Sequence, residues 1–280
     1  MIATGGARSL DAAACDALLR ARGGTVVGIV AGPEVGKTTM IATMYELVHR
    51  GRMKSFKFAG SETLRGYEER CHLARMSSNG AKADTTRTRT ADQLSFTHLR
   101  LATSSGIKDI IFSDRSGEHF DNVLDRPSEI FKFSELQRAD AILLLVDLEQ
   151  LYKSPHQPKS QVRRLFLAME QTGLLVGKSV TFVGTKADLL ESPNAAEDAR
   201  LALTELAAEL GRRSSGGLHV ASCCIASRAK AGSVRIGEGL EDLLNEILVD
   251  DEVSGFMLGT AWPSRVSELD GLMYSFRSVR

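Results

Sequence analysis

This 280-residue sequence has no excess of charge of either sign, because Lys plus Arg and Asp plus Glu number 35 each. Without an overall basic field, we expect no attraction to nucleic acid or to an acidic membrane surface. The sequence also lacks an apolar run long enough to cross a bilayer, and its first residues lack the charged-then-apolar order of a secretory signal. These absences predict a cytoplasmic protein that binds neither nucleic acid nor membrane.

Cysteine is scarce as well. The four cysteines, Cys15, Cys71, Cys223 and Cys224, show no CxxC spacing, and the adjacent pair is poorly placed to bridge to itself. We therefore expect reduced thiols. Cys71 precedes a histidine, but no second pair of ligands accompanies them, so the sequence predicts no zinc site there.

The apolar content of 43% is enough for one substantial core, and we favour one elaborated domain over two small ones. Continuous apolar runs predict strands covered on both faces at 25–30, 141–146 and 180–184, with a weaker candidate at 218–221. Helical spacing is predicted to alternate with them in the stretches 9–21, 37–49, 157–172, 194–211 and 239–249. This order predicts an α/β domain with a mostly parallel sheet.

The middle of the chain departs from this alternation. Residues 93–101 alternate at period two and, after a turn at 104–106, lead into 109–114, so an antiparallel hairpin is predicted. Before the hairpin, Ser61 is a candidate N-cap for a helix that runs to about Arg75. The polar stretch 76–90 that follows is predicted to be a loop.

The first predicted strand is followed by a phosphate-binding motif, because residues 31–38 read Ala-Gly-Pro-Glu-Val-Gly-Lys-Thr, a P-loop pattern. Such a loop aims backbone N–H groups at phosphate oxygens, while Lys37 reaches the β and γ phosphates and Thr38 binds magnesium. Gly36 allows a tight turn where a side chain would collide with phosphate. The predicted phosphate-binding residues are Gly32, Pro33, Glu34, Val35, Gly36, Lys37, Thr38 and Thr39.

A second motif, Asp114-Arg115-Ser116-Gly117, ends the predicted hairpin and fits a DxxG box. An acidic residue at a strand end can hold magnesium through a water, and Gly117 lets its N–H approach a γ-phosphate. An ordinary Asp-to-Gly turn is the structural alternative. Glu118 follows, where many small GTPases place a glutamine, and it can either act as a base toward water or repel the phosphate; His119 is a second candidate.

A third motif, Thr185-Lys186-Ala187-Asp188, follows the strand at 180–184 and fits a guanine-selecting box. The Asp188 carboxylate can accept hydrogen bonds from the N1–H and the 2-amino group of guanine, and adenine has neither donor there. Lys186 can lay its stem over the base, and Thr185 can brace the P-loop. The alternative is a simple helix start with Asp188 as a cap.

Two further elements are ambiguous. A base-contacting loop is expected after the last strand, and we place it at Ser222 and Cys223, with Ala226–Ser227 as the other alignment. The switch threonine that would complete the magnesium shell is one of Thr85, Thr86, Thr88 and Thr90. Thr90 is preferred, which makes Thr38, Thr90 and Asp114 the predicted metal site and Lys37, Glu118 and Thr90 the predicted catalytic residues. A solvated linker is the alternative for the threonines, and Arg87 or Arg89 is a candidate internal arginine finger.

Together the three motifs resemble the TRAFAC class of P-loop GTPases over about residues 23–250. The resemblance implies a three-layer sandwich, a Ras-like G domain with an insertion around 52–90. A helical extension (1–22) would precede it and a tail (251–280) that includes Trp262 would follow. The segment 58–72 is similar to an insertion in bacterial double-GTPase proteins of GTPase-associated conflict systems, which are proposed to act in prokaryotic defence.

The resemblance implies a magnesium-dependent molecular switch that hydrolyses GTP to GDP. Its partner would be an effector or a second GTPase that reads residues 76–90 and 115–125. One alternative is a GTP-binding scaffold with little or no hydrolysis. Another is an ATP-using kinase or ATPase, which would require the third motif to be accidental.

Overall fold

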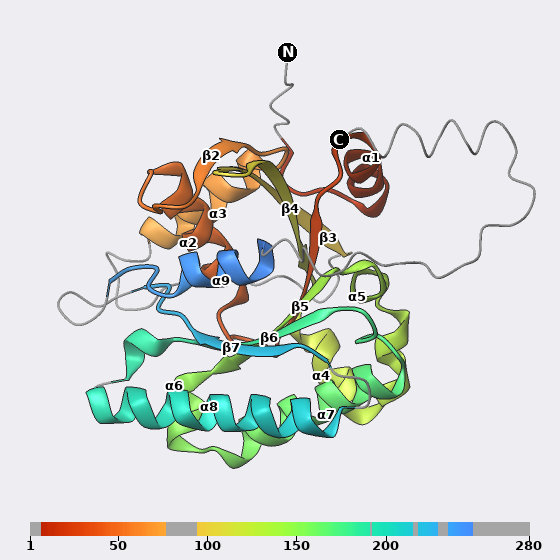
Figure 1. The fold of residues 1–280 in the computed structure, drawn as a ribbon, viewed down its shortest axis with the longest axis vertical. Helices are drawn as coiled ribbons and strands as arrows, with labels where there is room; N and C mark the ends of the chain where they lie inside the picture. The colour runs from red at the N-terminus through yellow and green to blue at the C-terminus, as the bar shows by residue number, and fades with distance from the viewer. Residues whose placement is uncertain (1–6, 77–93, 191, 215–217, 229–234, 249–280) are drawn as a thin grey trace, which may run out of the picture. The chain divides into compact units, whose positions relative to one another are not determined.

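The structure is a computed structural model that describes residues 7–76, 94–190, 192–214, 218–228 and 235–248 (Figure 1). All of the described residues belong to one compact unit, which ends at Leu248. Several predictions fall outside the described residues: those on Thr85, Thr86, Thr88, Thr90, Arg87 and Arg89, and those on the tail with Trp262.

Seven strands form one sheet in the order β2-β3-β4-β1-β5-β6-β7. β3 pairs antiparallel with β2 and with β4, and all other neighbouring strands are parallel, so β3 alone runs against the rest of the sheet. The predicted α/β fold, with a mostly parallel sheet and one antiparallel hairpin strand, is confirmed. The strands are β1 (Thr25–Val30), β2 (Lys57–Gly60), β3 (Ser95–Thr103), β4 (Gly106–Asp114), β5 (Ala141–Asp147), β6 (Ser179–Thr185) and β7 (Val220–Cys224).

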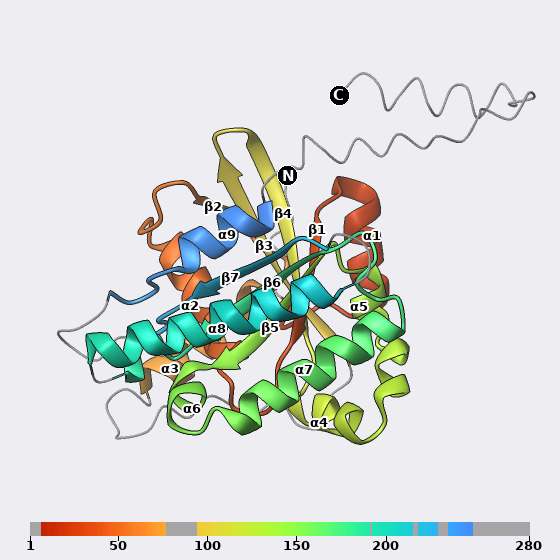
Figure 2. The same ribbon diagram turned by 60° about the horizontal axis from the view of Figure 1, so that its bottom comes forward.

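Helices cover both faces of this sheet (Figures 1 and 2). α2, α3 and α9 contribute to the core on one face, and α4 to α8 contribute to the core on the other. The described helices are α1 (Ala12–Arg22), α2 (Lys37–His49), α3 (Leu64–Met76), α4 (Gly117–Asp125), α5 (Ser134–Arg138), α6 (Leu148–Lys153), α7 (His156–Gln171), α8 (Pro193–Arg213) and α9 (Leu240–Leu248), with 3-10 turns η2 (Pro127–Lys132) and η3 (Ala187–Leu189). None of these helices is long and apolar enough to cross a membrane.

The two faces are built from alternate residues of the same strands, because successive side chains of a strand point to opposite sides. Ile29 and Leu143 pack in the core under α2 and α9, whereas Val30, Ile142 and Leu144 pack in the core under α7 and α8. All seven residues of the central strand β5 are buried. This double coverage is why the strand reads as an unbroken apolar run in the sequence.

The insertion between α2 and β3 extends the sheet by the edge strand β2 and adds α3 beside α2. The N-terminal helix α1 packs on the hairpin through Cys15 and Leu18, which contact the region of Phe96 and Ile111. Asp11 caps α1 by accepting a hydrogen bond of 2.8 Å from the Ala14 N–H. The leading helix predicted at 9–21 is therefore present, displaced by a few residues.

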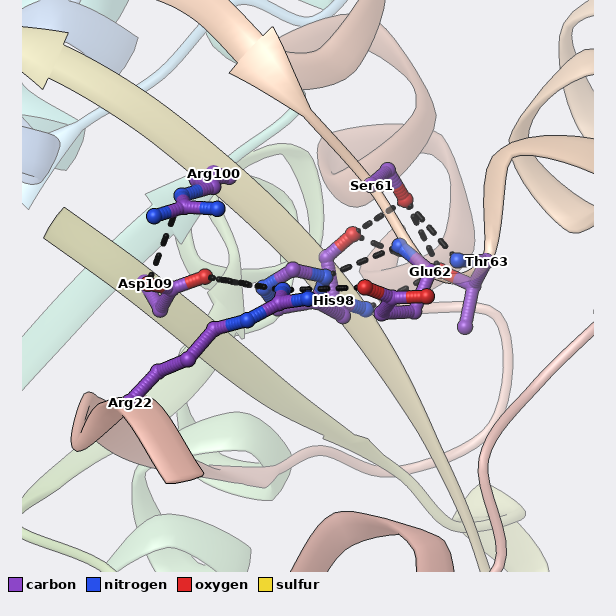
Figure 3. Close-up of polar contacts among 7 residues, drawn as sticks. All are labelled: Arg22, Ser61, Glu62, Thr63, His98, Arg100 and Asp109. Atoms are coloured by element: carbon purple, nitrogen blue, oxygen red, sulfur yellow. Dashed lines mark hydrogen bonds and ion pairs between the residues drawn. The ribbon is translucent and has the colours of Figure 1, made fainter. Parts of the chain in front are cut away.

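A buried polar network ties α1, the start of the insertion helix and the β3–β4 hairpin together (Figure 3). His98 Nε2 lies 2.7 Å from Asp109 Oδ1, and His98 Nδ1 accepts a 2.9 Å hydrogen bond from the Glu62 N–H. Arg22 pairs with Glu62 at 2.9 Å. The Ser61 hydroxyl donates to the His98 carbonyl at 2.6 Å, and α3 begins only at Leu64. Ser61 therefore joins the insertion to β3 and is not the N-cap of α3 that the sequence predicted.

Candidate functional site

The three sequence motifs follow β1, β4 and β6. These strands are mutually parallel, so their carboxyl ends lie at the same edge of the sheet. Loops at this edge are where open α/β sheets bind ligands. The second and the third motif also contact the P-loop directly.

The P-loop turns sharply into α2. Gly36 is the residue that precedes the helix, and its φ of 101° lies in the left-handed region that glycine tolerates best. Glu34, at φ 58°, is also left-handed. No side chain caps the N-terminus of α2. Its first N–H groups are therefore left to an anion, which the helix dipole also favours.

Lys37 connects this loop to the end of β4. Its side chain is buried, its Nζ lies 3.0 Å from Asp114 Oδ1, and it also donates to the Arg115 carbonyl. Asp114 is only 3% exposed. A buried carboxylate needs a cationic partner, and in this site Lys37 is one of them.

Gly117 brings the second motif against the P-loop. A Cβ added at this position would lie 2.5 Å from both the Gly32 carbonyl carbon and the Pro33 nitrogen. Only glycine allows this approach, which puts the Gly117 backbone beside the loop that would hold phosphate. Glu118 is exposed in the first turn of α4, and His119 Nδ1 is buried without a hydrogen-bond partner among the described residues.

Thr185 joins the third motif to the same loop. Its hydroxyl donates to the Val35 carbonyl at 2.5 Å and lies 3.2 Å from the Val146 carbonyl. This is the bracing contact that the sequence predicted for a threonine in place of the more usual asparagine. One hydroxyl thereby links the P-loop, β5 and β6.

The next residue, Lys186, is held by a partner that the sequence analysis missed. Lys186 has a left-handed φ of 60°, and its Nζ lies 2.6 Å from Asp147 Oδ2. The other Asp147 oxygen accepts a 3.0 Å hydrogen bond from the Gln150 N–H and caps α6. An aspartate directly after the apolar run at 141–146 was a readable signal, because polar residues at strand ends line such sites.

Asp188 lies inside η3, whose N-cap is Lys186, so Asp188 is not the N-terminal cap of that turn. Its charge acts on Arg228, which lies in the loop after β7. Burial lowers the pKa of the Arg228 guanidinium, and the carboxylates of Glu46 and Asp188 oppose that shift. The third motif and the loop after β7 are therefore close enough to interact.

The placement of the base-contacting loop at Ser222 and Cys223 requires a correction. Both residues lie within β7, paired with Phe182 and Val183 of β6, and burial raises the pKa of the Cys223 thiol to about 12. The loop begins at Ile225, whose carbonyl accepts a 3.2 Å hydrogen bond from the Ala187 N–H. The other alignment, Ala226–Ser227, is the one that follows the strand. The strand was predicted to end at residue 221, where its apolar run stops, but β7 continues to Cys224.

A second cation on Asp114 was also missed. Arg70, on α3, places Nη2 2.6 Å from Asp114 Oδ2. No sequence signal marks it, since Arg70 is one of several charged residues on a polar helix. Its proximity depends on how the insertion folds back over α2.

Two described residues offer the oxygen donors that magnesium prefers, the Thr38 hydroxyl in the first turn of α2 and the Asp114 carboxylate. Asp114 Oδ1 is buried and accepts no hydrogen bond from the described residues, although Lys37 lies near it. This donor set fits a hard cation that takes its remaining ligands from phosphate and water. No group of three or more His, Cys, Asp or Glu side chains in the described part of the chain is arranged to hold a metal.

Comparison with known proteins identifies the family. A model of the Double-GTPase 2 family matches residues 25–248. The chain belongs to this family. Membership in the Double-GTPase 2 family implies that the chain binds a guanine nucleotide.

A search of the curated proteins finds no match. Among solved structures, the chain is similar to the signal recognition particle receptor SRb-GTP/SRX complex from Chaetomium thermophilum. The identity is 13%, the TM-score is 0.46, and the match covers 80% of this chain and 97% of that chain.

Proposed function

We propose that this Double-GTPase 2 protein is a magnesium-dependent molecular switch that binds GTP and hydrolyses it to GDP. The observation that carries the proposal is the convergence of Asp114, Gly117 and Thr185 on one P-loop. Three motifs far apart in the sequence come together at the edge of the sheet where a nucleotide would lie. Each contributes a different recognition chemistry.

In this proposal the P-loop N–H groups and Lys37 bind the phosphates, and Gly117 approaches the third phosphate. Thr38 and Asp114 hold the cation, which supplies neutralisation of phosphate charge when it is bound. Asp188 selects guanine through its carboxylate, and Ala226–Ser227 take the place first assigned to Ser222 and Cys223. Thr90, outside the described residues, remains the proposed switch threonine.

The proposed hydrolysis is slow in the isolated protein. Glu118, the residue after Gly117, is exposed at the start of α4, so nothing in the described part of the chain holds its carboxylate over the P-loop. A partner that orders Glu118 or His119 would accelerate the reaction. This exposure also favours the second candidate, a GTP-binding scaffold with little hydrolysis.

We further propose a regulatory role in bacterial defence, on the similarity of segment 58–72 to double-GTPase proteins of conflict systems. The partner would be an effector or a second GTPase. It would read residues 76–90 and 115–125, the segments that switch proteins of this kind order around the third phosphate.

Nucleotide binding tests the site. The purified protein should bind a fluorescent GTP analogue that GTP displaces and ATP does not. Lys37→Ala should lose this binding, because the variant lacks the cation that reaches the phosphates. Lys132→Ala is the matched control, since Lys132 is 70% exposed and pairs with Glu129 on the surface. Tight GTP binding by Lys37→Ala would contradict the assignment.

Single-turnover hydrolysis separates the switch from the scaffold. Protein in excess over radiolabelled GTP should release phosphate in magnesium and should stop when the metal is chelated. Phosphate release no faster than in buffer alone, with GTP still bound, would favour the scaffold.

A further inference from the structure

Asp114 is held by two cations from different elements. Lys37 Nζ lies 3.0 Å from Oδ1, and Arg70 Nη2 lies 2.6 Å from Oδ2. The Asp114 side chain is only 3% exposed and that of Lys37 is 9% exposed, whereas that of Arg70 is 21% exposed, so the carboxylate is buried and the guanidinium is partly buried. Lys37 belongs to the P-loop, but Arg70 comes from the insertion. The proposed function gives Arg70 no role.

The position of Arg70 is set by the packing of α3 on α2. The Tyr67 ring stacks on Tyr45 with centroids 4.5 Å apart, and Cys71 Sγ lies 3.6 Å from the Ala42 carbonyl oxygen. These two contacts flank Arg70 along the helix and belong to the buried core. Because these contacts hold α3 in place on α2, the Arg70 guanidinium lies beside Asp114.

The contact is only partly satisfied. Arg70 Nη1 is buried and has no hydrogen-bond partner among the described residues. A buried donor without a partner is costly, so a guanidinium that turns away from Asp114 can gain a hydrogen bond for Nη1 as it loses one from Nη2. The pair with Asp114 is therefore suited to a contact that forms in one state and breaks in another.

The Asp114 carboxylate is also one of the two groups proposed to hold magnesium. A guanidinium on Asp114 and a divalent cation beside it would repel each other, and this repulsion is strong where water is excluded. The Arg70 guanidinium and a magnesium ion therefore compete for Asp114.

We propose that Arg70 is a latch that competes with magnesium for Asp114. It holds the carboxylate when the site lacks metal and nucleotide, and it leaves the carboxylate when magnesium and GTP bind. The inference rests on the proposed GTP and magnesium site. Its consequence would be regulatory, because α3 ends at Met76, the first residue of the segment 76–90 that we propose a partner reads.

The test measures how much magnesium is needed to retain nucleotide. Full-length protein carries a fluorescent, non-hydrolysable GTP analogue, and its dissociation is followed over a range of free magnesium set with a chelator. In Arg70→Met the half-saturating magnesium concentration should fall about tenfold, because one competing charge is gone. Arg70→Lys keeps the charge and should stay near wild type.

Arg65→Met is the matched control. It removes the same charge from the same helix, but Arg65 is 59% exposed and pairs with Glu69 at 3.0 Å. It should leave the magnesium requirement unchanged. An unchanged requirement in Arg70→Met would overturn the latch. A higher requirement would overturn it too, since Arg70 would then be orienting Asp114 for the metal.

Hydrogen exchange on wild-type protein tests the latch without any variant. Amides of residues 64–76 should exchange faster with magnesium and the GTP analogue than with the analogue and chelator. Equal exchange in the two conditions would overturn the inference while leaving GTP binding intact. A wild-type protein that binds no GTP would overturn the proposed function and the latch with it.

Discussion

The absence of a side chain at Gly117 allows the DxxG motif to lie directly against the P-loop. Because a Cβ there would lie 2.5 Å from the Gly32–Pro33 peptide, Gly117→Ala must push the P-loop or the start of α4 away. We expect a loss of about 1–3 kcal/mol in the free energy of unfolding, the usual cost of overpacking. We also expect weaker GTP binding. Urea unfolding and nucleotide titration measure the two effects.

The control for Gly117→Ala is Asn122→Ala on the exposed side of α4. It should change neither the free energy of unfolding nor the affinity. If Gly117→Ala bound GTP as tightly as wild type, the close approach of this backbone to the P-loop would have no role in binding.

The Thr185 hydroxyl is a second point at which one group joins several elements. Thr185→Val keeps the shape but removes the donor to the Val35 carbonyl, so a partly buried acceptor loses its partner. The expected cost is about 1–3 kcal/mol in the free energy of unfolding. Thr185→Ser retains the hydroxyl and should recover most of it. Equal stability of the Val and Ser variants in urea would show that the bracing bond contributes nothing.

At the scale of elements, the polar network of Figure 3 fixes the insertion to the hairpin. Asp109→Ala removes the partner of His98 Nε2 and leaves Arg22 and Arg100 without a carboxylate they approach at 4.0 and 3.6 Å. Asp109 is 6% exposed, so we expect a loss of about 3–5 kcal/mol in the free energy of unfolding, as for other broken buried pairs.

The surface pair of Glu149 and Lys153 provides the comparison, since the lysine is 62% exposed. Glu149→Ala should cost no more than about 0.5 kcal/mol, the usual worth of an exposed helical pair. Chemical denaturation of both variants decides the point. A loss below about 1 kcal/mol for Asp109→Ala would mean that the buried contacts of Asp109 contribute little to the stability of this network.

Elements with a full period of buried residues could be predicted from the sequence. The strands β1, β5 and β6 and the helices α2, α7 and α8 appear where their apolar patterns indicated. The helices α4, α5 and α6 were missed. For α5 and α6 the reason is that five and six residues carry too few turns to show a period. Which residues of different elements meet, such as Arg70 and Asp114, depends on tertiary packing that no local pattern records.

At the scale of the whole molecule, the order of strands explains why local motifs sufficed to predict the site. β1 lies between β4 and β5, and β6 follows β5, so the ends that carry the three motifs are near neighbours. Parallel pairing then puts these loops on one edge. The sequence was enough to place the motifs at strand ends. It did not predict that β2 forms the edge of the sheet or that α3 packs on α2.

A ligand that bridges these loops should stabilise the unit formed by residues 1–248 as a whole. At a GTP concentration 100 times the dissociation constant, mass action predicts about 2.7 kcal/mol of added stability toward unfolding. Asp188→Asn should lose this gain with GTP and recover it with a xanthine nucleotide, because the amide can donate to the added base oxygen where the carboxylate accepted from the amino group.

Thermal unfolding with GTP, ATP and xanthosine triphosphate measures the effect. Asp198→Asn, which makes the same change on the exposed face of α8, is the control and should keep the stabilisation by GTP. If Asp188→Asn retained it equally, guanine would be selected by other groups. Arg228 would then be the first residue to substitute, since it is half-buried, interacts with Asp188, and has a buried guanidinium nitrogen that lacks a partner among the described residues.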